Sequence, residues 1–233
     1  MRPTLSVAVA QLVVAATVEA NVAHHAAVVR AADARVVVFP ELSLTGYELA
    51  ADPVEVDDAR FWPLVSACAE AGAMALVGAP VMADGARCIA TLRVDAHGVS
   101  VVYRKLRPGR EELAACFEPG PASAVVEVDG WRLGLGICKD VKTPEQVAAT
   151  LALGVDAYLA GVVHVPDELD LQDALGAAIA RDGDVYVAFA SCAGATGGEY
   201  DQTAGHSAIW GSGGARLAIA GGGPGDLARA VLT

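Results

Sequence analysis

Apolar and polar positions follow two different periods along the first third of the chain. Residues 5–14 form a nearly continuous apolar run rich in valine, which is typical of a strand buried on both faces. Residues 17–32 place apolar side chains on one helical stripe and charged side chains mostly elsewhere. Residues 35–39 and 75–78 are short apolar runs, and residues 57–71 between them have a helical pattern. This order predicts βαβ units.

The middle of the chain contains two predicted β-hairpins. Their strand pairs are residues 88–94 with 99–104, and residues 124–128 with 131–137. Asp95-Ala-His-Gly98 joins the first pair and Asp129-Gly130 the second. The Asp-Gly pair is the stronger signal, because both residues tolerate the positive φ of a two-residue hairpin turn.

The last ninety residues return to alternating strands and helices. Pro144 suits the first turn of a helix that ends by Gly154. The remaining predicted elements are strands at 157–163 and 185–190, a helix at 169–181, and closing strands at 207–210, 216–220 and 228–232. Interleaved βαβ units and hairpins predict mixed sheets with helices packed outside them. No linker or internal repeat divides the chain, so we expect one domain over residues 1–233.

Composition and charge exclude several classes of partner. With 54% apolar and 19% charged residues, the chain has enough apolar side chains for a sizeable core. A net charge of −12 argues against a nucleic-acid partner, because phosphate binding needs clustered lysine and arginine. No basic amphipathic face indicates a membrane surface, and no apolar run reaches the roughly 18 residues of a membrane-spanning helix.

The cysteines and histidines indicate reduced thiols and no metal site. Five cysteines without CxxC spacing favour a cytoplasmic protein, and no HxxxH pair occurs among the five histidines. We therefore expect no metal site. A lone cysteine is usually a small buried apolar residue, and we apply that interpretation to Cys68, Cys88, Cys116 and Cys192.

Three apolar runs end in a reactive side chain. These are Glu41, Lys105 and Cys138. In layered α/β folds, ligands bind beyond the carboxyl ends of strands, so these three groups converge in one cleft if their strands share that edge. A free thiol with a pKa of about 8.5 is only a few per cent thiolate at neutral pH. We expect Glu41 to accept the thiol proton, and Lys105 to lower the thiol pKa and face a developing oxyanion.

Around these residues the chain resembles the nitrilase, or carbon–nitrogen hydrolase, superfamily. The matching segments follow the family's order over nearly the whole chain: FPELSLTGY (39–47), YRK (103–105), FEPG (117–120), GICKD (136–140), PE (144–145) and GHS (205–207). The resemblance implies an αββα sandwich of two mixed β-sheets with outer helix layers, usually assembled into homodimers or larger homo-oligomers. It also implies a Glu41, Lys105 and Cys138 triad that works without a metal or organic cofactor.

Three features refine the resemblance. Many members use a second glutamate a few residues after the lysine, and Glu112 stands at that spacing with Glu111 beside it. True nitrilases commonly carry Cys-Trp-Glu, whereas this chain has Cys138-Lys139-Asp140. The difference favours an amide or carbamoyl substrate over a nitrile. Arg107 replaces the family's usual histidine two residues after the lysine.

Four further residues are candidates for substrate binding, each with a plainer alternative. Glu145 lines the pocket or is a first-turn charge that favours the helix dipole. Tyr47 packs beside the site or in the core, and Lys139 tunes the thiol or is solvated. His164 lines the pocket, is a satisfied core histidine, or acts as the base of a Cys-His pair. His206 has the same structural alternatives.

The sequence thus predicts hydrolysis of a small linear amide or N-carbamoyl compound through a thioester at Cys138, with release of ammonia or an amine. Three alternatives remain open at this stage. They are a nitrilase or acyl-transferring relative, a catalytically silent nitrilase-like binding or scaffold module, and a Cys-His hydrolase that uses His164.

Overall fold

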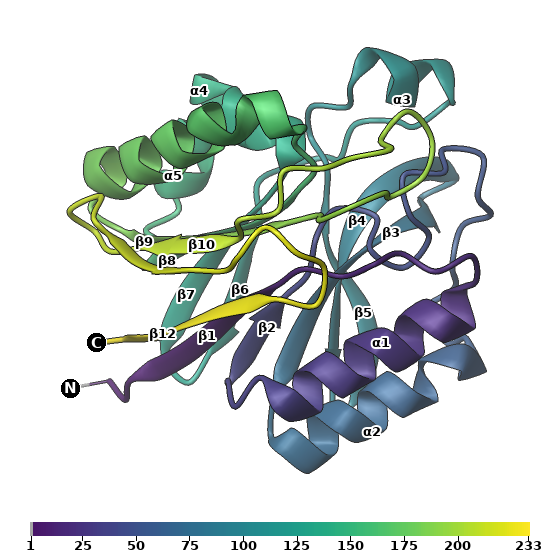
Figure 1. Cartoon of the computed structure of the whole chain (residues 1–233), viewed down its shortest axis with the longest axis horizontal. Coiled ribbons are helices and arrows are strands. Elements are labelled where there is room, and N and C mark those ends of the chain that lie inside the picture. The colour runs from purple at the N-terminus through teal and green to yellow at the C-terminus, as the bar shows by residue number, and fades with distance from the viewer. Residues whose placement is uncertain (1) are drawn as a thin grey trace.

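The apolar runs form two six-stranded β-sheets that pack face to face, each with helices on its outer side (Figure 1). The computed structural model describes residues 2–233. The strands are β1 (Leu5–Ala10), β2 (Val36–Val38), β3 (Met74–Ala83), β4 (Ala86–Asp95), β5 (Gly98–Arg104), β6 (Val125–Val128), β7 (Trp131–Ile137), β8 (Ala157–Val162), β9 (Tyr186–Ser191), β10 (Ala208–Trp210), β11 (Arg216–Ile219) and β12 (Leu227–Leu232). The α-helices are α1 (Val18–Ala31), α2 (Trp62–Ala71), α3 (Arg110–Ala114), α4 (Pro144–Leu151) and α5 (Leu169–Gly183). Short 3-10 helices span Ala59–Phe61, Cys138–Lys142 and Pro166–Glu168.

Both sheets have the same plan. The strand order is β12-β1-β2-β3-β4-β5 in the first sheet and β11-β10-β9-β8-β7-β6 in the second. In each, three central strands are parallel and are joined through helices, and the outer strands pair antiparallel. Parallel strands require cover on both faces, which explains why these runs are apolar throughout.

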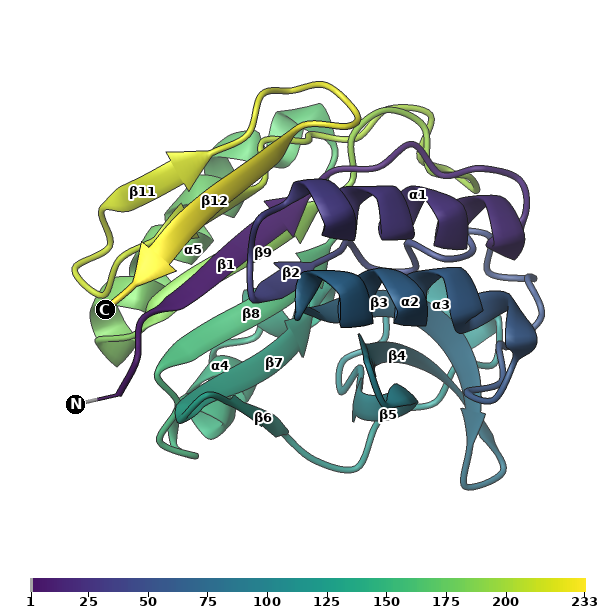
Figure 2. The same cartoon turned by 90° about the horizontal axis from the view of Figure 1, so that it is seen from below.

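The helices complete four layers. Figure 2 shows α1 and α2 side by side along the outer face of the first sheet. In Figure 1, α4 and α5 lie across the second sheet. One apolar core lies between the two sheets and one lies under each helix pair. The predicted αββα sandwich of two mixed sheets is therefore confirmed.

Two predicted strand boundaries are wrong for identifiable reasons. The first strand ends at Ala10 rather than residue 14, because the Gln11 side chain turns to the C-terminal segment and donates to Gly223 O at 2.7 Å. Strand β3 runs on to Ala83 instead of ending at Gly78. Its second half pairs antiparallel with β4, and Asp84-Gly85 makes a hairpin turn with positive φ at both residues. Our sequence interpretation did not use that Asp-Gly signal.

Two helical segments also differ from the prediction. The helix expected at 57–71 consists of the 3-10 turn Ala59–Phe61 followed by α2, with Pro63 in the first turn of α2. Helix α3 was not predicted. It is a short helix of five residues, and it carries Glu112.

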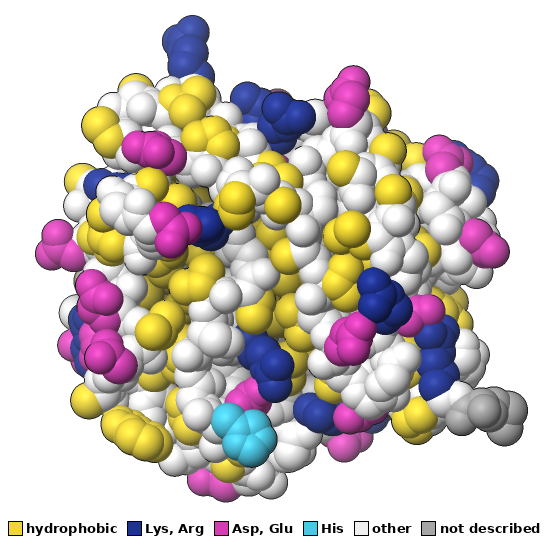
Figure 3. Space-filling view, turned by 180° about the vertical axis from the view of Figure 1, so that it is seen from behind, with side chains coloured by type: hydrophobic (Ala, Val, Ile, Leu, Met, Phe, Trp, Pro, Cys, Tyr) yellow, Lys and Arg dark blue, Asp and Glu magenta, His cyan; other side chains and the backbone are white. Residues whose placement is uncertain are grey.

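Charges on the surface are mixed. On the face seen in Figure 3, lysine and arginine side chains lie beside aspartate and glutamate rather than gathering into one patch. In the described part of the chain, none of the helices has the length and apolar character to cross a membrane.

The core between the sheets gives a prediction about stability. Leu159 on β8 is 1% exposed and lies in that core. We expect Leu159→Ala to lower the free energy of unfolding by about 2–5 kcal/mol, because it removes buried methyl groups and leaves a cavity. Urea titration followed by circular dichroism measures this. The control Leu217→Ala, at a leucine that is 50% exposed, should change stability by less than about 0.5 kcal/mol. Equal effects would contradict this assignment of the core.

Candidate active site

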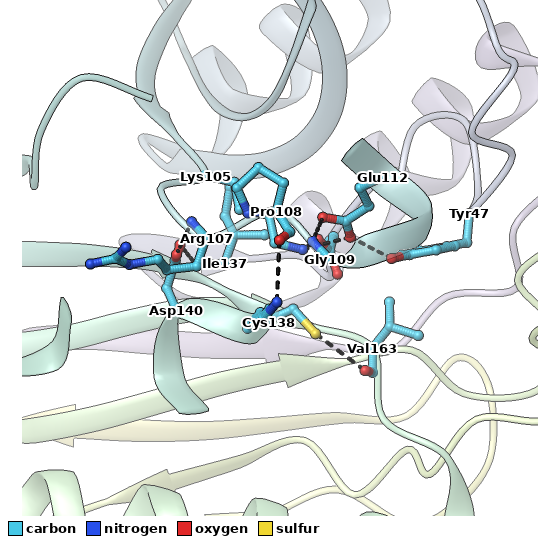
Figure 4. Close-up of polar contacts among 12 residues, drawn as sticks. Tyr47, Lys105, Arg107, Pro108, Gly109, Glu112, Ile137, Cys138, Asp140 and Val163 are labelled. Atoms are coloured by element: carbon cyan, nitrogen blue, oxygen red, sulfur yellow. Dashed lines mark hydrogen bonds and ion pairs between the residues drawn. The ribbon is translucent and has the colours of Figure 1, made fainter. Parts of the chain in front are cut away.

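Three strand ends from the two facing sheets meet at one buried group of charges. Glu41 follows β2, Lys105 follows β5 and Cys138 follows β7. Lys105 Nζ lies 2.6 Å from Glu41 Oε1 and 2.6 Å from Glu112 Oε1. Each of these three charged side chains is at most 2% exposed. Figure 4 shows Cys138 beside Lys105 and Glu112, so the structure brings the predicted groups together.

Glu112 is the second glutamate that contacts the lysine. Its Oε1 accepts hydrogen bonds from Lys105 Nζ and from the Tyr47 hydroxyl, and its Oε2 accepts one from Gly109 N at 2.7 Å. Glu111 is exposed. Because both oxygens of Glu112 are already engaged, this carboxylate is suited to hold Lys105 rather than to exchange protons.

The two carboxylate oxygens of Glu41 differ in their contacts. Its Oε2 is buried and has no hydrogen-bond partner among the described residues. Burial raises the pKa of Glu41 to about 7; Lys105 opposes this shift and the charge of Glu112 adds to it. The Cys138 thiol also lowers the Glu41 pKa slightly, which places the thiol next to the carboxylate. Glu41 therefore changes charge near neutral pH.

The lysine and the thiol respond to burial in different ways. Burial alone would lower the pKa of Lys105, but the charges of Glu41, Cys138 and Glu112 outweigh it and raise that pKa. Burial raises the pKa of Cys138 and Glu41 raises it further, while Lys105 acts in the opposite direction. We expected Lys105 to lower the thiol pKa. Its charge does so, but burial outweighs it, and the resting thiol is protonated.

The backbone at Cys138 has an uncommon conformation. Its φ is +40°, at the first residue of the 3-10 helix that follows β7. A non-glycine residue there costs on the order of 1–3 kcal/mol unless its surroundings hold it in place. In the resting state the thiol donates to Val163 O at 3.3 Å.

Asp140 holds this turn, and our sequence interpretation missed that role. Its Oδ2 accepts from Ile137 N at 3.0 Å and from the Tyr103 hydroxyl at 2.9 Å, and its Oδ1 accepts from Arg107 N at 2.9 Å. Asp140 thereby ties the cysteine turn to the segment that carries the lysine. The sequence showed only that Asp140 stands where nitrilases carry a different residue.

Two glycines make room for the turn that carries Glu41. A Cβ on Gly161 of β8 would lie 2.6 Å from Phe39 O and 2.8 Å from Glu41 N. A Cβ on Gly78 of β3 would lie 2.5 Å from Pro40 O. Real Cβ atoms do not approach so closely, so the turn occupies its position only because both strands lack a side chain there.

The other candidates differ in their positions. Tyr47 reaches the site through Glu112. Lys139 is exposed and donates to Pro108 O at 3.3 Å, and Glu145 is exposed in the first turn of α4. The buried His164 ring bonds through Nδ1 to Gln172 Oε1 at 3.0 Å, whereas the Cys138 thiol bonds to Val163 O. This arrangement does not make a Cys-His pair.

The loop after β9 contributes a residue that we did not predict. The Tyr200 ring packs edge-on against Tyr47, with 4.7 Å between ring centroids. Thr196 O accepts from Tyr47 N at 2.6 Å, which fixes this loop beside the site. Burial raises the pKa of Tyr200 to about 12, and the charges of Cys138 and Glu41 add to the shift. Only the resulting tertiary contact singles out this tyrosine.

The remaining cysteines are mostly buried. Cys68, Cys88 and Cys192 are buried as expected, but Cys116 is exposed, which corrects our prediction. Cys116 has a φ of +64° and lies two residues after the end of α3. In residues 2–233, no cluster of three or more histidine, cysteine, aspartate or glutamate side chains is arranged to hold a metal ion.

Comparisons with known sequences point to one enzyme family. A family model described as carbon-nitrogen hydrolase matches residues 6–230. The chain is similar to a protein of Pseudomonas protegens named "Hydrolase in pqqF 5'region", with 30% identity over 205 residues, 84% of this chain and 71% of that protein.

Solved structures agree with that match. The chain is similar to the amidase from Nesterenkonia sp. AN1, in a variant whose active-site cysteine has added acrylamide, with a TM-score of 0.84, 26% identity, and coverage of 98% of this chain and 93% of that one. Another variant of that amidase is in complex with butyramide. Saccharomyces cerevisiae Nit3, a nitrilase superfamily member, shares the fold at 20% identity, with a TM-score of 0.85 and coverage of 98% and 90%.

The glycine contacts give a prediction for this site. We expect Gly161→Ala to lower the free energy of unfolding by about 1–3 kcal/mol, because the added Cβ forces the Phe39 carbonyl and the Glu41 backbone away from β8. Thermal unfolding followed by circular dichroism measures the loss. Gly213→Ala is the control, since a Cβ there meets no atom within 4 Å. A Gly161→Ala protein as stable as the control would show that the turn is not confined in this way.

Proposed function

The chain belongs to the carbon–nitrogen hydrolase family, and from that premise we propose that it hydrolyses a small linear amide or N-carbamoyl compound through a thioester at Cys138. The products are the free acid and ammonia or an amine. The observation that carries the proposal is the buried Lys105, held between Glu41 and Glu112 beside the cysteine thiol.

In the acylation half-reaction, Glu41 takes the thiol proton on its free oxygen, Oε2. The Cys138 sulfur attacks the carbonyl carbon, and the carbonyl oxygen becomes an oxyanion. Glu41 then returns the proton to the leaving nitrogen as the carbon–nitrogen bond breaks. The raised pKa of Glu41, about 7, suits a group that both accepts and donates a proton near neutral pH.

Lys105 is proposed to stabilise the oxyanion. Glu41 and Glu112 raise its pKa and hold its ammonium group in place, so that little reorganisation is needed when the negative charge develops. The Lys139 backbone N–H, in the first turn of the 3-10 helix, is the proposed second donor. One such donor is typically worth about 3–4 kcal/mol of transition-state stabilisation.

In the second half-reaction a water molecule replaces the departed amine. Glu41, again a carboxylate, takes a proton from this water, and the resulting hydroxide attacks the thioester carbon. The carbon–sulfur bond breaks, the acid leaves, and the proton returns to the sulfur of Cys138. Transfer of the acyl group to an amine instead of water would make the protein an acyltransferase. Product analysis separates the two.

A small amide is the substrate that the available observations favour. The Nesterenkonia amidase, at 26% identity, takes up acrylamide at its cysteine and binds butyramide in its variants. Here the Tyr47–Tyr200 pair and the nearly complete burial of Glu41, Lys105 and Glu112 are consistent with a compact acyl group. The Lys139-Asp140 pair after the cysteine also differs from the Trp-Glu that is common in nitrilases.

A covalent adduct is the direct test of this proposal. We expect acrylamide to add once to Cys138 in intact-protein mass spectrometry, and acetamide or butyramide to release ammonia. Cys138→Ala should lose both, whereas Cys116→Ala, at an exposed cysteine, should keep both. The panel includes carbamoyl compounds and nitriles. No adduct on Cys138 and no ammonia across it would favour a silent binding module, and an acyl adduct from an amide substrate on another cysteine would overturn the assignment.

The pH dependence of hydrolysis tests Glu41 as the base. Because only its carboxylate accepts the thiol proton, activity should fall about tenfold per pH unit below a midpoint near 7. Glu41→Gln should lower kcat by at least about 100-fold. Glu112→Gln should move the midpoint to lower pH, because the charge of Glu112 helps raise the Glu41 pKa.

The matched control for this profile is Glu111→Gln. Glu111 is the exposed neighbour of Glu112, so its loss should leave both rate and midpoint unchanged. Full activity of Glu41→Gln would contradict the role of Glu41 as the base. A rate that stays constant between about pH 5 and 8, a range that reaches about two units below the expected midpoint, would contradict it as well.

A further inference from the structure

Helix α1 carries a buried histidine that the proposed reaction does not use. His25 is 0% exposed, although its neighbour His24 on the same helix is exposed. Its ring packs on Phe39, with 4.3 Å between ring centroids, just before the turn that carries Glu41. Buried polar groups are normally hydrogen-bonded, so the partners of this imidazole show what it holds in place next to the proposed base.

The hydrogen bonds of His25 have a defined direction. Its Nδ1 lies 2.6 Å from Asn21 O, and a carbonyl only accepts, so Nδ1 carries the proton. Burial lowers the pKa of His25 to about 4, so the ring is neutral at physiological pH and Nε2 is an acceptor. The Ser43 hydroxyl, 2.9 Å away, therefore donates to Nε2. The Ser43 oxygen in turn accepts from Gly78 N at 3.3 Å.

One turn earlier on α1, Asn21 holds the next residue of the same segment. Its Nδ2 donates to Leu44 O at 2.9 Å and to Ala15 O at 3.0 Å, and its Oδ1 accepts from Ala15 N at 2.7 Å. Asn21 and His25 are four residues apart and so lie on one face of the helix. Together they fix Ser43 and Leu44, the second and third residues after Glu41.

The turn between these anchors and the base has little freedom of its own. Leu42 has a φ of +51°, and its N–H borders the space that Gly78 leaves free. A residue in this conformation persists only where its surroundings determine it. The backbone bonds from Ser43 N to Pro40 O and from Gly46 N to Leu42 O close the segment locally. Two links tie it to the rest of the fold: Leu44 N donates to Gly78 O on β3 at 3.0 Å, and the side chains of α1 hold Ser43 and Leu44.

We propose that His25, acting through Ser43, is a positioning residue for Glu41: it locks the turn after β2 so that the free oxygen of Glu41 faces the Cys138 thiol. This inference rests on the proposed role of Glu41 as the base. His25 touches neither the thiol nor the substrate. Its contribution is geometric, and a misplacement on the order of 1 Å at a reacting group can cost about 100-fold in rate.

The test compares four variants by two readouts. His25→Phe keeps a ring against Phe39 but removes the acceptor, whereas His25→Gln offers an oxygen near the position of Nε2. Ser43→Ala removes the donor from the other side, and His24→Phe is the matched control on the exposed face of α1. The readouts are kcat and KM for butyramide, and the rate of Cys138 alkylation by iodoacetamide at one fixed pH. Peptide mass spectrometry follows this alkylation, with Cys116 as the internal reference.

We expect His25→Phe and Ser43→Ala each to lower kcat about 10- to 100-fold with KM within about twofold. Both should also slow Cys138 alkylation relative to Cys116, because the buried thiol reacts only as Glu41 takes its proton, and this loss outweighs the lower thiol pKa that a more distant Glu41 charge gives. His25→Gln should recover most of both rates, and His24→Phe should match the wild type. The double variant His25→Phe/Ser43→Ala should be no worse than Ser43→Ala, which already breaks the link to His25 and also removes the acceptor of Gly78 N.

The alkylation readout separates positioning from general support of the fold. A loosened site would expose the thiol and make Cys138 alkylation faster, which would overturn the proposal, as would unchanged rates in His25→Phe. Additive losses in the double variant would also overturn it. If His25→Phe does not fold, Ser43→Ala and His25→Gln still decide the outcome. If no variant, including the wild type, turns over an amide while the alkylation rates follow the expected order, the proposed function fails and the link between His25 and the base stands.

Discussion

The structure of the site depends on one buried positive charge. Lys105 is 2% exposed, and an ammonium group that is removed from water is tolerated only if it is paired and hydrogen-bonded. Two carboxylates pair with it, each at 2.6 Å. The lysine therefore fixes where β5 ends, where α3 begins and where the turn after β2 must lie. Burial raises the pKa of Glu41, and the single positive charge of Lys105, shared with Glu112, does not fully offset that shift.

The two carboxylates differ because their second oxygens differ. Glu112 accepts a hydrogen bond from a backbone N–H at Oε2 and one from a tyrosine hydroxyl at Oε1. Neither oxygen is therefore free to accept a transferred proton. Glu41 has a buried oxygen with no partner in the described chain and a pKa of about 7. The same side chain thus acquires two different capacities from the number of donors around it, which is a common way to separate a positioning acid from a proton carrier.

The sequence predicted the features that depend on local patterns of residues. Apolar runs, helical stripes and an Asp-Gly turn gave the layers, and motifs at strand ends marked Glu41, Lys105 and Cys138. Other features arise only when distant segments meet. The contacts of Asp140, Tyr200 and His25 join segments that are far apart in the sequence, and no spacing rule anticipates them. The length of β3 was missed because glycine and proline, here Gly78 and Pro80, usually mark the end of a strand. In the structure the antiparallel pairing with β4 continues past both residues.

The empty space at Gly78 and Gly161 has a consequence for how this chain tolerates change. Any substitution of a glycine by an L-amino acid adds at least a Cβ, and at these two positions that atom would meet the backbone around Glu41. Every single amino-acid substitution at these two positions is therefore expected to disturb the backbone around Glu41. In a scan of single substitutions we therefore expect these two glycines to be as intolerant as Glu41, Lys105 and Cys138. The reason is that the space left by their missing Cβ atoms is occupied by the turn that carries Glu41.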